Sequence, residues 1–355
     1  MARIRVAVAG VGNCASALIQ GVHFYKETES PDVIGLTAYS LGGYELDDIE
    51  FVAAFDVSVA KVGRDLSEAV FSAPNNTVKI AALPKLGVQV SMGPVLDGVG
   101  KYLSDVVRIS DAQVADVRSI LKESGAEILV NYLPVGSANA TFFYAQEAIE
   151  AGVAFINAMP VFIASNPSWQ SRFEARRLPV AGDDVMSQIG ATVLHKTLIR
   201  LCVDRGVRVD ETYQLNIGGD TDFLNMLEES RLIDKRESKT SAVRAMAPYE
   251  IPTRIGPSDY VPFLENDKIC YIWLKGRYFG DVPVTIDLKL HVIDAYDSAG
   301  VMVDAIRGMK IALDRQIAGA LTSVSAFCFK HPPIQMPYND AKHAFEEFVA
   351  GQRDR

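Results

Sequence analysis

The stretch RIRVAVAGVGNCAS, residues 3–16, decides how the chain begins to fold. Its first half is an apolar run that predicts a buried strand, and an apolar-periodic helix to about Lys26 follows the glycines. Gly10, Gly12 and Ala15 fit the pattern GxGxx(G/A), whose members permit a tight turn, a close approach of pyrophosphate and close helix packing. The helix N-terminus adds free N–H groups for phosphate. The stretch therefore predicts a dinucleotide site, with an ordinary strand–helix turn as the alternative.

A second predicted strand, residues 51–57, carries the acidic partner that such a site needs. Asp56 lies at its end and suits the two hydroxyls of an adenosine ribose. An aspartate rather than an arginine at this place favours NAD over NADP. The usual spacing of about 20 residues is exceeded, because a loop rich in Gly, Ser and Asp, residues 29–50, intervenes.

Strands and helices alternate again from residue 110 to about residue 190. The expected elements are a helix from Ser110 to about Ser124, a helix ending at Gly152, a helix over 168–177, and strands at 127–134, 154–160 and 178–184. Such alternation predicts an α/β fold with a Rossmann-type, doubly wound parallel sheet.

The pattern changes after about residue 190. A long helix is expected over 187–205, and two strand-like runs follow at 268–280 and 282–294. The apolar positions of the second run alternate, which predicts one covered face of an antiparallel sheet; they are Val282, Val284, Ile286, Leu288 and Leu290. An amphipathic helix is expected from Ser298 to about Ala318. We infer a cofactor domain of residues 1–190 and 296–355, interrupted by an α+β domain of residues 191–295.

The bulk composition excludes several classes of protein. The chain has 355 residues, 49% of them hydrophobic, and a net charge of -9, which argues against binding nucleic acid or an acidic membrane. An anionic substrate would therefore need a local cationic pocket. The four cysteines show no metal-binding spacing, which is typical of reduced thiols, and no targeting segment is evident. These features predict a cytoplasmic protein.

Two polar elbows interrupt the apolar elements. AGDDVMSQIGAT, residues 181–192, places Asp183 and Asp184 at a strand end, where ligands of parallel sheets bind. LNIGGDTDFLNM, residues 215–226, combines a glycine pair with Asp220 and Asp222. Helix-capping aspartates would produce the same patterns, so both interpretations stay open on spacing alone.

LIDKRESKTSAV, residues 232–243, holds Lys235 and Lys239. If the segment is helical, these lysines point the same way and repel by roughly 0.2–0.5 kcal/mol. A solvated helix face is the ordinary explanation of such a charge run. The alternative is one wall of a pocket for an anion.

Five separated blocks resemble the inositol-1-phosphate synthase family, closest to its short bacterial and archaeal branch. In chain order they are GDDVMSQIGAT, LNIGGDTDFLNMLE, KRESKTSAV, IGPSDYVPFLENDK and DSAGVMVDAIRGMKIALDR. GVGNCAS, AAFDVS and NYLPVGS are similar to the cofactor domain of that family. The resemblance covers nearly the whole chain.

The resemblance implies a reaction and an assembly. Such enzymes convert D-glucose 6-phosphate to 1L-myo-inositol 1-phosphate, the first step of inositol biosynthesis. C5 is oxidised, C6 is enolised, C6 attacks C1 in an aldol closure, and the same NADH reduces C5 again, so a tightly bound NAD is recycled. The family is typically a homotetramer, and residues 191–295 would be its catalytic and tetramerisation domain.

The resemblance also implies the site residues. The catalytic set is Lys235, Lys239, Lys268, Lys310, Asp184 and Asp222. The residues expected to bind the substrate are Ser187, Asn216, Gly219, Asp220 and Asp297. The cofactor would contact Gly10, Gly12, Asn13, Cys14, Ala15, Ser16, Asp56, Asn131, Asp183 and Asp184. Lys235 and Lys310 are expected at the C5 oxygen and the enolate, and Lys268 with Ser187 at the phosphate.

One departure and two alternatives accompany this interpretation. Met186 stands where the family usually has a lysine, which removes one cation near the first elbow. A divalent metal is an option, but the sequence offers no dedicated metal motif. The alternatives are a net NAD-dependent dehydrogenase of another sugar phosphate and a non-enzymatic regulator that binds NAD or a sugar phosphate.

Overall fold

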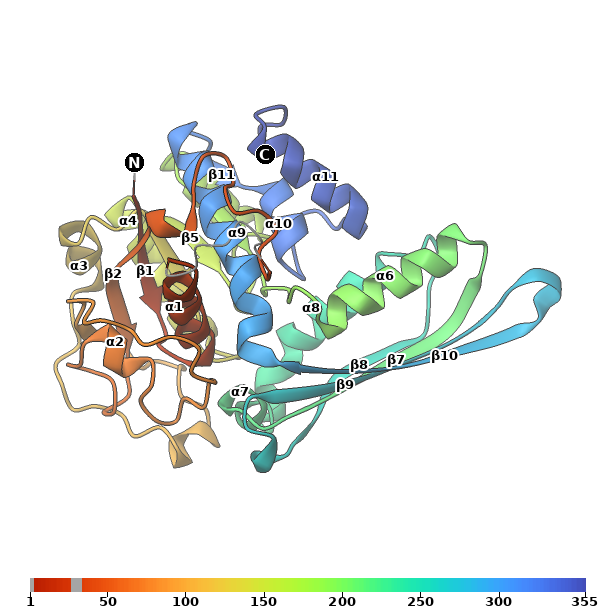
Figure 1. Cartoon of the computed structure of the whole chain (residues 1–355), viewed down its shortest axis with the longest axis horizontal. Coiled ribbons are helices and arrows are strands. Elements are labelled where there is room, and N and C mark those ends of the chain that lie inside the picture. Colours follow the sequence, from red (N-terminus) through yellow and green to blue (C-terminus); the bar gives the residue numbers. More distant parts are fainter. Residues whose placement is uncertain (1–2, 27–33) are drawn as a thin grey trace.

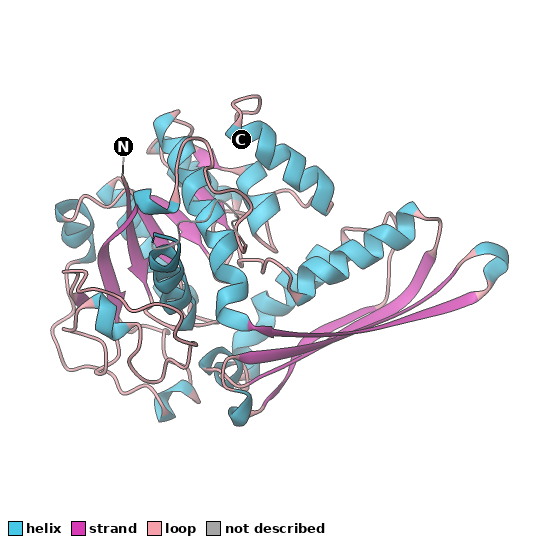
Figure 2. Ribbon diagram, viewed as in Figure 1, coloured by secondary structure: helices cyan, strands magenta, loops and turns pink. Residues whose placement is uncertain are grey.

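The computed structural model describes residues 3–26 and 34–355, and it consists of two lobes joined along one side (Figure 1). One lobe is built on a parallel sheet and the other on a long, twisted sheet of mixed, mainly antiparallel strands (Figure 2). Residues 29–33 of the predicted loop 29–50 lie outside the described residues. No helix within the described residues combines the length and the hydropathy needed to cross a membrane.

The first lobe holds a seven-stranded sheet in the order β11-β6-β5-β4-β1-β2-β3. Its strands are β1 Ile4–Ala9, β2 Ile49–Asp56, β3 Val90–Met92, β4 Ile128–Asn131, β5 Ala154–Asn157, β6 Pro179–Gly182 and β11 Gly319–Ala320. All six neighbouring pairs are parallel. The expected doubly wound sheet is therefore confirmed.

Helices cover both faces of this sheet, because the strand side chains alternate between two cores. Val6 and Val8 point toward α1, α9, α10 and α11, whereas Ala7 and Ala9 point toward α3, α4 and α5. The helices are α1 Asn13–Lys26, α2 Leu66–Ala69, α3 Val117–Glu123, α4 Ala138–Ala151, α5 Pro167–Ala175, α9 Asp294–Asp314, α10 Thr322–Cys328 and α11 Tyr338–Val349. Short 3-10 helices are η1 Leu46–Asp48 and η2 Leu103–Asp105.

Three predicted helix boundaries are wrong. Residues 110–116 are not helical, because Ser110 and Ala115 donate their N–H groups to the strand region, and α3 begins only after Asp116 caps it. α6 begins at Ala191 rather than near residue 187, because the N–H of Gln188 is held by the backbone of Asp297. α9 runs over Asp294–Asp314, four residues earlier at each end than the expected range of 298–318.

The second lobe holds a four-stranded sheet in the order β10-β9-β7-β8. Its elements are α6 Ala191–Asp204, β7 Arg208–Gly218, α7 Thr221–Asn225, η3 Glu229–Leu232, α8 Ile233–Arg244, β8 Thr253–Tyr260, η4 Pro262–Leu264, β9 Asp267–Arg277, η5 Phe279–Asp281 and β10 Pro283–Ile293. The pairs of β9 with β7 and β10 are antiparallel as expected, and β7 pairs with β8 in parallel. α6 and α8 lie along one face (Figure 1).

The alternating positions of β10 face these helices. Ile286, Leu288 and Leu290 are half-buried against α6 and the neighbouring strands, as the alternation predicts. Val282 lies before the strand and is 45% exposed, so it does not belong to this face. Among the described residues no α-helix packs on the opposite face of the sheet (Figure 1). The strand register places the exposed side chains of Tyr213 and Tyr271 on that face.

Candidate active site

A cavity lies where the two lobes meet, at the carboxyl ends of the parallel strands. Its empty space is about 1220 Å³ up to the open mouth, and an adjoining cavity of about 730 Å³ extends over the glycine turn. The two share a wall made by Gly12, Leu103, Tyr132, Leu133, Pro134 and Thr221. The two cavities are therefore adjoining parts of one space at the edge of the sheet, which is where open α/β sheets bind their ligands.

The glycine turn has the geometry that the sequence predicts. Gly10 has φ +92°, and a Cβ there would lie 2.6 Å from the carbonyl oxygen of Tyr132, so another residue would be both strained and crowded. A Cβ at Gly12 would meet nothing within 4 Å, which leaves this position open to a ligand. Ala15 is fully buried under the turn. α1 then begins at Asn13 and presents its N-terminus to the cavities.

Asp56 lies beside this turn at the end of β2. Its carboxylate accepts hydrogen bonds from the N–H groups of Val11, Val57 and Ser58 at 2.8–2.9 Å, and Lys61 lies 3.8 Å away. Asp56 therefore ties the first two strands together while it lines the adjoining cavity. That is the place for a ribose-binding carboxylate in a Rossmann-type fold.

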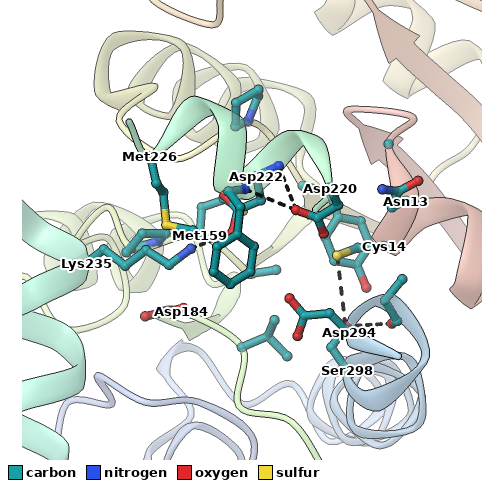
Figure 3. A pocket seen from close by; sticks show the side chains of 18 of the residues that line it. Asn13, Cys14, Met159, Asp184, Asp220, Asp222, Met226, Lys235, Asp294 and Ser298 are labelled. Atoms are coloured by element: carbon teal, nitrogen blue, oxygen red, sulfur yellow. Dashed lines mark hydrogen bonds and ion pairs between the residues drawn. The ribbon is translucent and has the colours of Figure 1, made fainter. Parts of the chain in front are cut away.

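Three lysines of the main cavity are each paired with a carboxylate. Lys235 donates to Asp222 at 2.6 Å (Figure 3), Lys268 to Asp294 at 2.7 Å and Lys330 to Asp184 at 2.9 Å. Burial lowers the pKa of Lys235, but the charges of Asp222 and Asp184 outweigh it and the pKa is raised. Asp294 likewise raises the pKa of Lys268 against its burial. Lys235 and Lys268 are therefore firmly charged at neutral pH.

Lys239 has no carboxylate within ion-pair distance in the described part of the chain. It lies one turn after Lys235 on α8 and is 5% exposed. Burial lowers the pKa of Lys239 to about 7, and the charges of Lys235, Lys268 and Lys330 act in the same direction. Lys239 can therefore give up or take a proton near neutral pH, as a proton shuttle must.

Asp220 is the carboxyl counterpart of Lys239. It caps α7 by accepting from the N–H groups of Asp222 and Phe223, and it is 7% exposed (Figure 3). Burial raises the pKa of Asp220 to about 7, with Asp222 and Asp294 adding to the effect. Of the four lysines and four aspartates that line the cavity, Lys239 and Asp220 are the two outside the three close pairs.

Asp184 joins the two lobes at this site. Its backbone has φ +63°, in the left-handed region that aspartate tolerates better than most residues, and such residues cluster at functional sites. Its carboxylate accepts from the hydroxyl of Ser238 on α8 at 2.7 Å as well as from Lys330. Burial would raise the pKa of Asp184, but the charges of Lys330 and Lys235 and these hydrogen bonds hold it below its ordinary value.

The segment that carries Asp220 and Lys235 also contacts the first lobe through Arg231. Arg231 donates to the carbonyl oxygens of Val135 and Asp97 at 2.8 Å and to the hydroxyl of Ser137 at 3.2 Å. The amide of Asn225 donates to the same carbonyl of Val135. These hydrogen bonds hold α7 and η3 against the loops that form the shared wall of the two cavities.

Known proteins resemble the chain over its whole length. It is 51% identical over 356 residues to the inositol-3-phosphate synthase of Mycolicibacterium smegmatis, which covers 98% of each chain. It is 48% identical over 355 residues to the inositol-3-phosphate synthase of Corynebacterium glutamicum, again with 98% of each chain covered. The chain belongs to the inositol-3-phosphate synthase family. The family model described as Myo-inositol-1-phosphate synthase matches residues 190–295, and the resemblance seen in the sequence blocks is confirmed.

Solved structures agree with this membership. The crystal structure of Ari2 superposes with a TM-score of 0.80 at 33% identity over 98% of this chain and 99% of the other. A myo-inositol-1-phosphate synthase-related protein from Thermotoga maritima gives 0.82 at 25% identity, with 98% of both chains covered. The inositol-3-phosphate synthase of Caenorhabditis elegans, at 15% identity and a TM-score of 0.76, shares the fold.

Lys310 lies outside the cavity, so the prediction that it lines the cavity with the other lysines is wrong. Its Nζ lies 2.8 Å from Glu127 and 2.9 Å from Asp314, near the C-terminal end of α9. Asp314 also accepts from the hydroxyl of Tyr44. α9 runs away from the cavity, so its N-terminal residues Asp294 and Ser298 line the site and Lys310 does not.

Lys330, rather than the predicted Lys310, is the fourth lysine that lines the cavity. The backbone of residues 328–331 runs antiparallel beside residues 183–186, with four N–H···O bonds of 2.7–3.1 Å between them. This pairing sets the side chain of Lys330 against Asp184. Lys330 carries no motif of its own; a lysine directly after the apolar run SAFCF is the one local sign. Asp294 was also missed, although it ends β10 much as Asp183 and Asp184 follow β6.

Asn131 and Asp183 are predicted to contact the cofactor, but their side chains instead hold loops that surround the site. The amide of Asn131 donates to Thr141 and Asn157, and no part of Asn131 lines either cavity. The carboxylate of Asp183 is fully buried and accepts from Asn157 and from the backbone of residues 163–165. Each holds a loop of the sheet edge, so its expected contact with the cofactor is corrected.

The other predicted cofactor residues divide between lining and support. Asn13 and Cys14 line the main cavity (Figure 3), and the Asn13 amide is fixed by Asn76. Ser16 is fully buried, where its hydroxyl accepts from Gln20, and like Ala15 it lines neither cavity. The sequence thus identifies the turn but not how many of its side chains face outward.

Substrate-binding predictions divide in the same way. Ser187 and Asp220 line the cavity. Asp297 supports the loop before α6 by accepting from the N–H of Ile189 at 3.0 Å. Asn216 and Gly219 do not line it: Asn216 donates to the carbonyl of Gly256, and a Cβ at Gly219 would lie 2.4–2.5 Å from neighbouring backbone atoms. Asn216 and Gly219 therefore support the framework of the site and do not belong to the residues that line the cavity.

The structure also bears on the position of Met186 and on the option of a divalent metal. Met186 is 5% exposed and does not line the cavity. In residues 3–26 and 34–355, no group of three or more His, Cys, Asp or Glu side chains is placed to hold a metal ion. A divalent metal therefore stays without assigned ligands.

Proposed function

We propose that this chain converts D-glucose 6-phosphate to 1L-myo-inositol 1-phosphate with a bound NAD that is used and restored within each turnover. The observation that carries this proposal is the group of four lysines in the cavity beside the glycine turn. A sugar phosphate is a dianion whose oxygens become more negative during oxidation, enolisation and aldol closure. Fixed cations in a largely buried site stabilise such charge.

The residues of the adjoining cavity fit NAD. Gly12 leaves room for a pyrophosphate, the N-terminus of α1 provides N–H donors, and Asp56 suits a ribose diol without a neighbouring arginine for a 2′-phosphate. When bound, NAD supplies the acceptance and the later return of a hydride at C5. The chain's own residues then have to bind the sugar, move protons and exclude water.

The lysines divide these tasks by their charge. Lys268 with Ser187 is assigned to the phosphate, because Lys268 is firmly charged and both side chains line the cavity. Lys235 is assigned to the oxygen at C5, where its charge stabilises an oxyanion. Lys330 takes the second place at the enolate that the sequence suggested for Lys310. Asp184 and Asp222 fix the positions of these lysines.

Proton transfer is assigned to Lys239 and Asp220, the two groups whose pKa values lie near neutrality. Neutral Lys239 can accept the proton of the C5 hydroxyl as hydride leaves C5, and it can return this proton when the ketone is reduced. Ionised Asp220 can accept the proton that C6 loses on enolisation and can then donate it to the alkoxide that forms at C1. Each group would end the cycle in the state in which it began.

The test uses purified protein, D-glucose 6-phosphate and a catalytic amount of NAD⁺. Inositol phosphate that forms without lasting NADH absorbance at 340 nm supports the cyclase. NADH in proportion to the sugar consumed, without inositol phosphate, would show the net dehydrogenase instead. Binding of both ligands without turnover would show the non-enzymatic regulator. Lys235→Ala should abolish turnover, and unchanged turnover would overturn the assignment of Lys235.

A homotetramer and a cytoplasmic location complete the proposal. The helix-free face of the second sheet supports assembly, because it carries the stacked rings of Tyr213 and Trp273 beside exposed Leu215 and Tyr271. Exposed apolar surface of this kind is typical of protein interfaces. Size-exclusion chromatography with light scattering tests the assembly, and a monomer at micromolar concentration would contradict it.

A further inference from the structure

Tyr132 lies directly against the glycine turn. It follows β4, and its N–H donates to the carbonyl of Ala9 at 2.8 Å. Its own carbonyl is the group that a Cβ at Gly10 would strike. The tight packing of these backbones fixes where the side chain of Tyr132 begins, so its position does not depend on a mobile loop.

The hydroxyl of Tyr132 has no hydrogen-bond partner among the described residues. The side chain belongs to a residue that is 8% exposed, and the hydroxyl oxygen itself is buried. Burial raises the pKa of this phenol, with the nearby Cys14 adding to the effect, so the group stays a neutral O–H donor. A buried hydroxyl without a partner costs free energy, and native structures rarely tolerate it without a reason.

The hydroxyls of three other tyrosines illustrate the usual pairing with the backbone. Tyr25 donates to the carbonyl of Ile34, and Tyr296 donates to that of Val78 at 2.6 Å. The hydroxyl of Tyr249 accepts from the N–H of Val209. Tyr132 is the one tyrosine in residues 3–26 and 34–355 whose buried hydroxyl is left unpaired. A missing partner at this place points to a ligand.

The location of Tyr132 selects the ligand. Tyr132 belongs to the wall that both cavities share, between Asp56 on one side and the lysines on the other. A sugar phosphate bound by the lysines occupies the main cavity alone. A dinucleotide with its ribose at Asp56 must pass this wall to bring its nicotinamide to the sugar, and its diphosphate and second ribose offer oxygen acceptors there.

We propose that Tyr132 donates its hydroxyl hydrogen to an oxygen of the bound dinucleotide, in the stretch from the diphosphate to the nicotinamide ribose. Tyr132 is then a cofactor-binding residue that helps to hold NAD through a turnover in which it must not leave. This inference rests on the proposed use of NAD. It gives the cavity-lining Tyr132 of the NYLP segment a role that Asn131, which lines neither cavity, does not have.

Tyr132→Phe is the test, because it removes one oxygen atom and keeps the ring. Isothermal titration calorimetry on the full chain should give a Kd for NAD⁺ that is about 10-fold higher, the ratio expected for one lost hydrogen bond. The melting temperature without NAD should be unchanged or higher, since the variant no longer buries an unpaired hydroxyl. The rise in melting temperature that NAD⁺ causes should be smaller than in the wild type.

Tyr296→Phe is the matched control. It removes a hydroxyl that is paired with the backbone and lines neither cavity. Its Kd for NAD⁺ should equal that of the wild type, and its melting temperature without NAD should fall. The two variants thus separate loss of a ligand contact from loss of a structural hydrogen bond.

Three outcomes would overturn the inference. One is an unchanged Kd for NAD⁺ in Tyr132→Phe, as a buried water on the hydroxyl would give. The second is a change confined to the KM for glucose 6-phosphate at saturating NAD⁺, which would make Tyr132 a substrate contact. The third is a lower melting temperature with an unaltered response to NAD⁺. A wild type that binds NAD⁺ but forms no inositol phosphate would defeat the proposed function and leave this inference standing.

Discussion

Lys239 and Lys310 both lie on helices, and each residue is at least nine-tenths buried. The charges that surround the two residues are nevertheless opposite in sign. Lys310 has two carboxylates within 2.9 Å, Glu127 and Asp314, so its charge is used within the protein. Lys239 has no carboxylate within ion-pair distance in the described residues, and burial together with the charges of three other lysines lowers its pKa. An uncompensated buried charge is costly for the folded state alone. This difference indicates that the positive charge of the cavity serves to bind a ligand, whereas the charge of Lys310 serves to stabilise the fold.

The largest expected effect is on turnover. Lys239→Met should lower kcat/KM by about 10²- to 10⁴-fold, the usual contribution of a general acid–base group. Lys310→Met should leave kcat/KM within about threefold, the range expected when no group in the cavity is touched. Formation of inositol phosphate from glucose 6-phosphate, measured with both variants at equal folded concentration, checks the contrast. Equal losses in the two variants would contradict it.

The pH dependence of stability should sharpen the comparison. The pKa of Lys239 is about 7 in the folded chain, against an ordinary value of 10.5. Between these pH values the unfolded chain binds more protons at this residue, so the stability of the empty protein rises with pH from about 7 to 10.5. Below about pH 7 the full cost of the buried charge is present.

Lys239→Met should remove this contribution. Its free energy of unfolding should exceed that of the wild type most clearly at pH 6–7, and the gap should close toward pH 10. Urea denaturation without ligands at several pH values measures it. Lys310→Met is the control, since the pKa of Lys310 is raised by Glu127 and Asp314 against burial and changes stability only above its ordinary range. Parallel profiles of the wild type and Lys239→Met would rule out the low pKa.

A smaller effect is expected where Lys310 acts on the fold. Lys310→Met leaves Glu127 and Asp314 facing each other without the cation that holds them. The expected loss is about 1–2 kcal/mol, below that of a fully buried pair because Asp314 is 44% exposed. Urea denaturation at pH 7 checks this value. No loss of stability would mean that solvent already screens the cluster.

The same comparison shows what the sequence could predict. The buried strand, the glycine turn and α1 follow from short-range patterns, and the structure confirms them. The placement of Lys310 in the cavity conflicts with the predicted helix itself. Asp297 and Lys310 are separated by 13 residues, which is about 20 Å of helix at 1.5 Å per residue. One end of α9 can reach the site, and the other cannot.

The rest of the site depends on contacts that no local pattern contains. Lys330 reaches Asp184 because residues 328–331 pair with residues 183–186 across a sequence separation of about 145 residues. Similarly, the sequence predicts one helix over residues 110–124, although the N–H groups of Ser110 and Ala115 donate to the region of the neighbouring strands. Short-range patterns therefore predict the elements, whereas their partners in the fold decide where they end and which charges meet.

The smallest expected effect concerns the contact between the lobes. Arg231 and Arg236 lie one and a half turns apart, but Arg231 makes three hydrogen bonds to the cofactor lobe and Arg236 pairs with exposed Glu229 at 3.4 Å. Arg231→Ala should free α7 and η3 from the wall of the cavities, so that NADH leaves about 3- to 10-fold faster, as for the loss of about 1 kcal/mol of hydrogen bonding.

Stopped-flow chase of bound NADH, followed by its fluorescence, measures this release. Arg236→Ala should match the wild type, because its ion pair is exposed and contributes little. Equal acceleration in both variants would mean that total charge near the mouth, rather than the hydrogen bonds of Arg231, sets the release of the cofactor. Faster release in Arg231→Ala alone would add a second kind of retention to the cavity. The lysines would then retain the substrate by charge, and the three hydrogen bonds of Arg231 would retain the cofactor by holding the two lobes together.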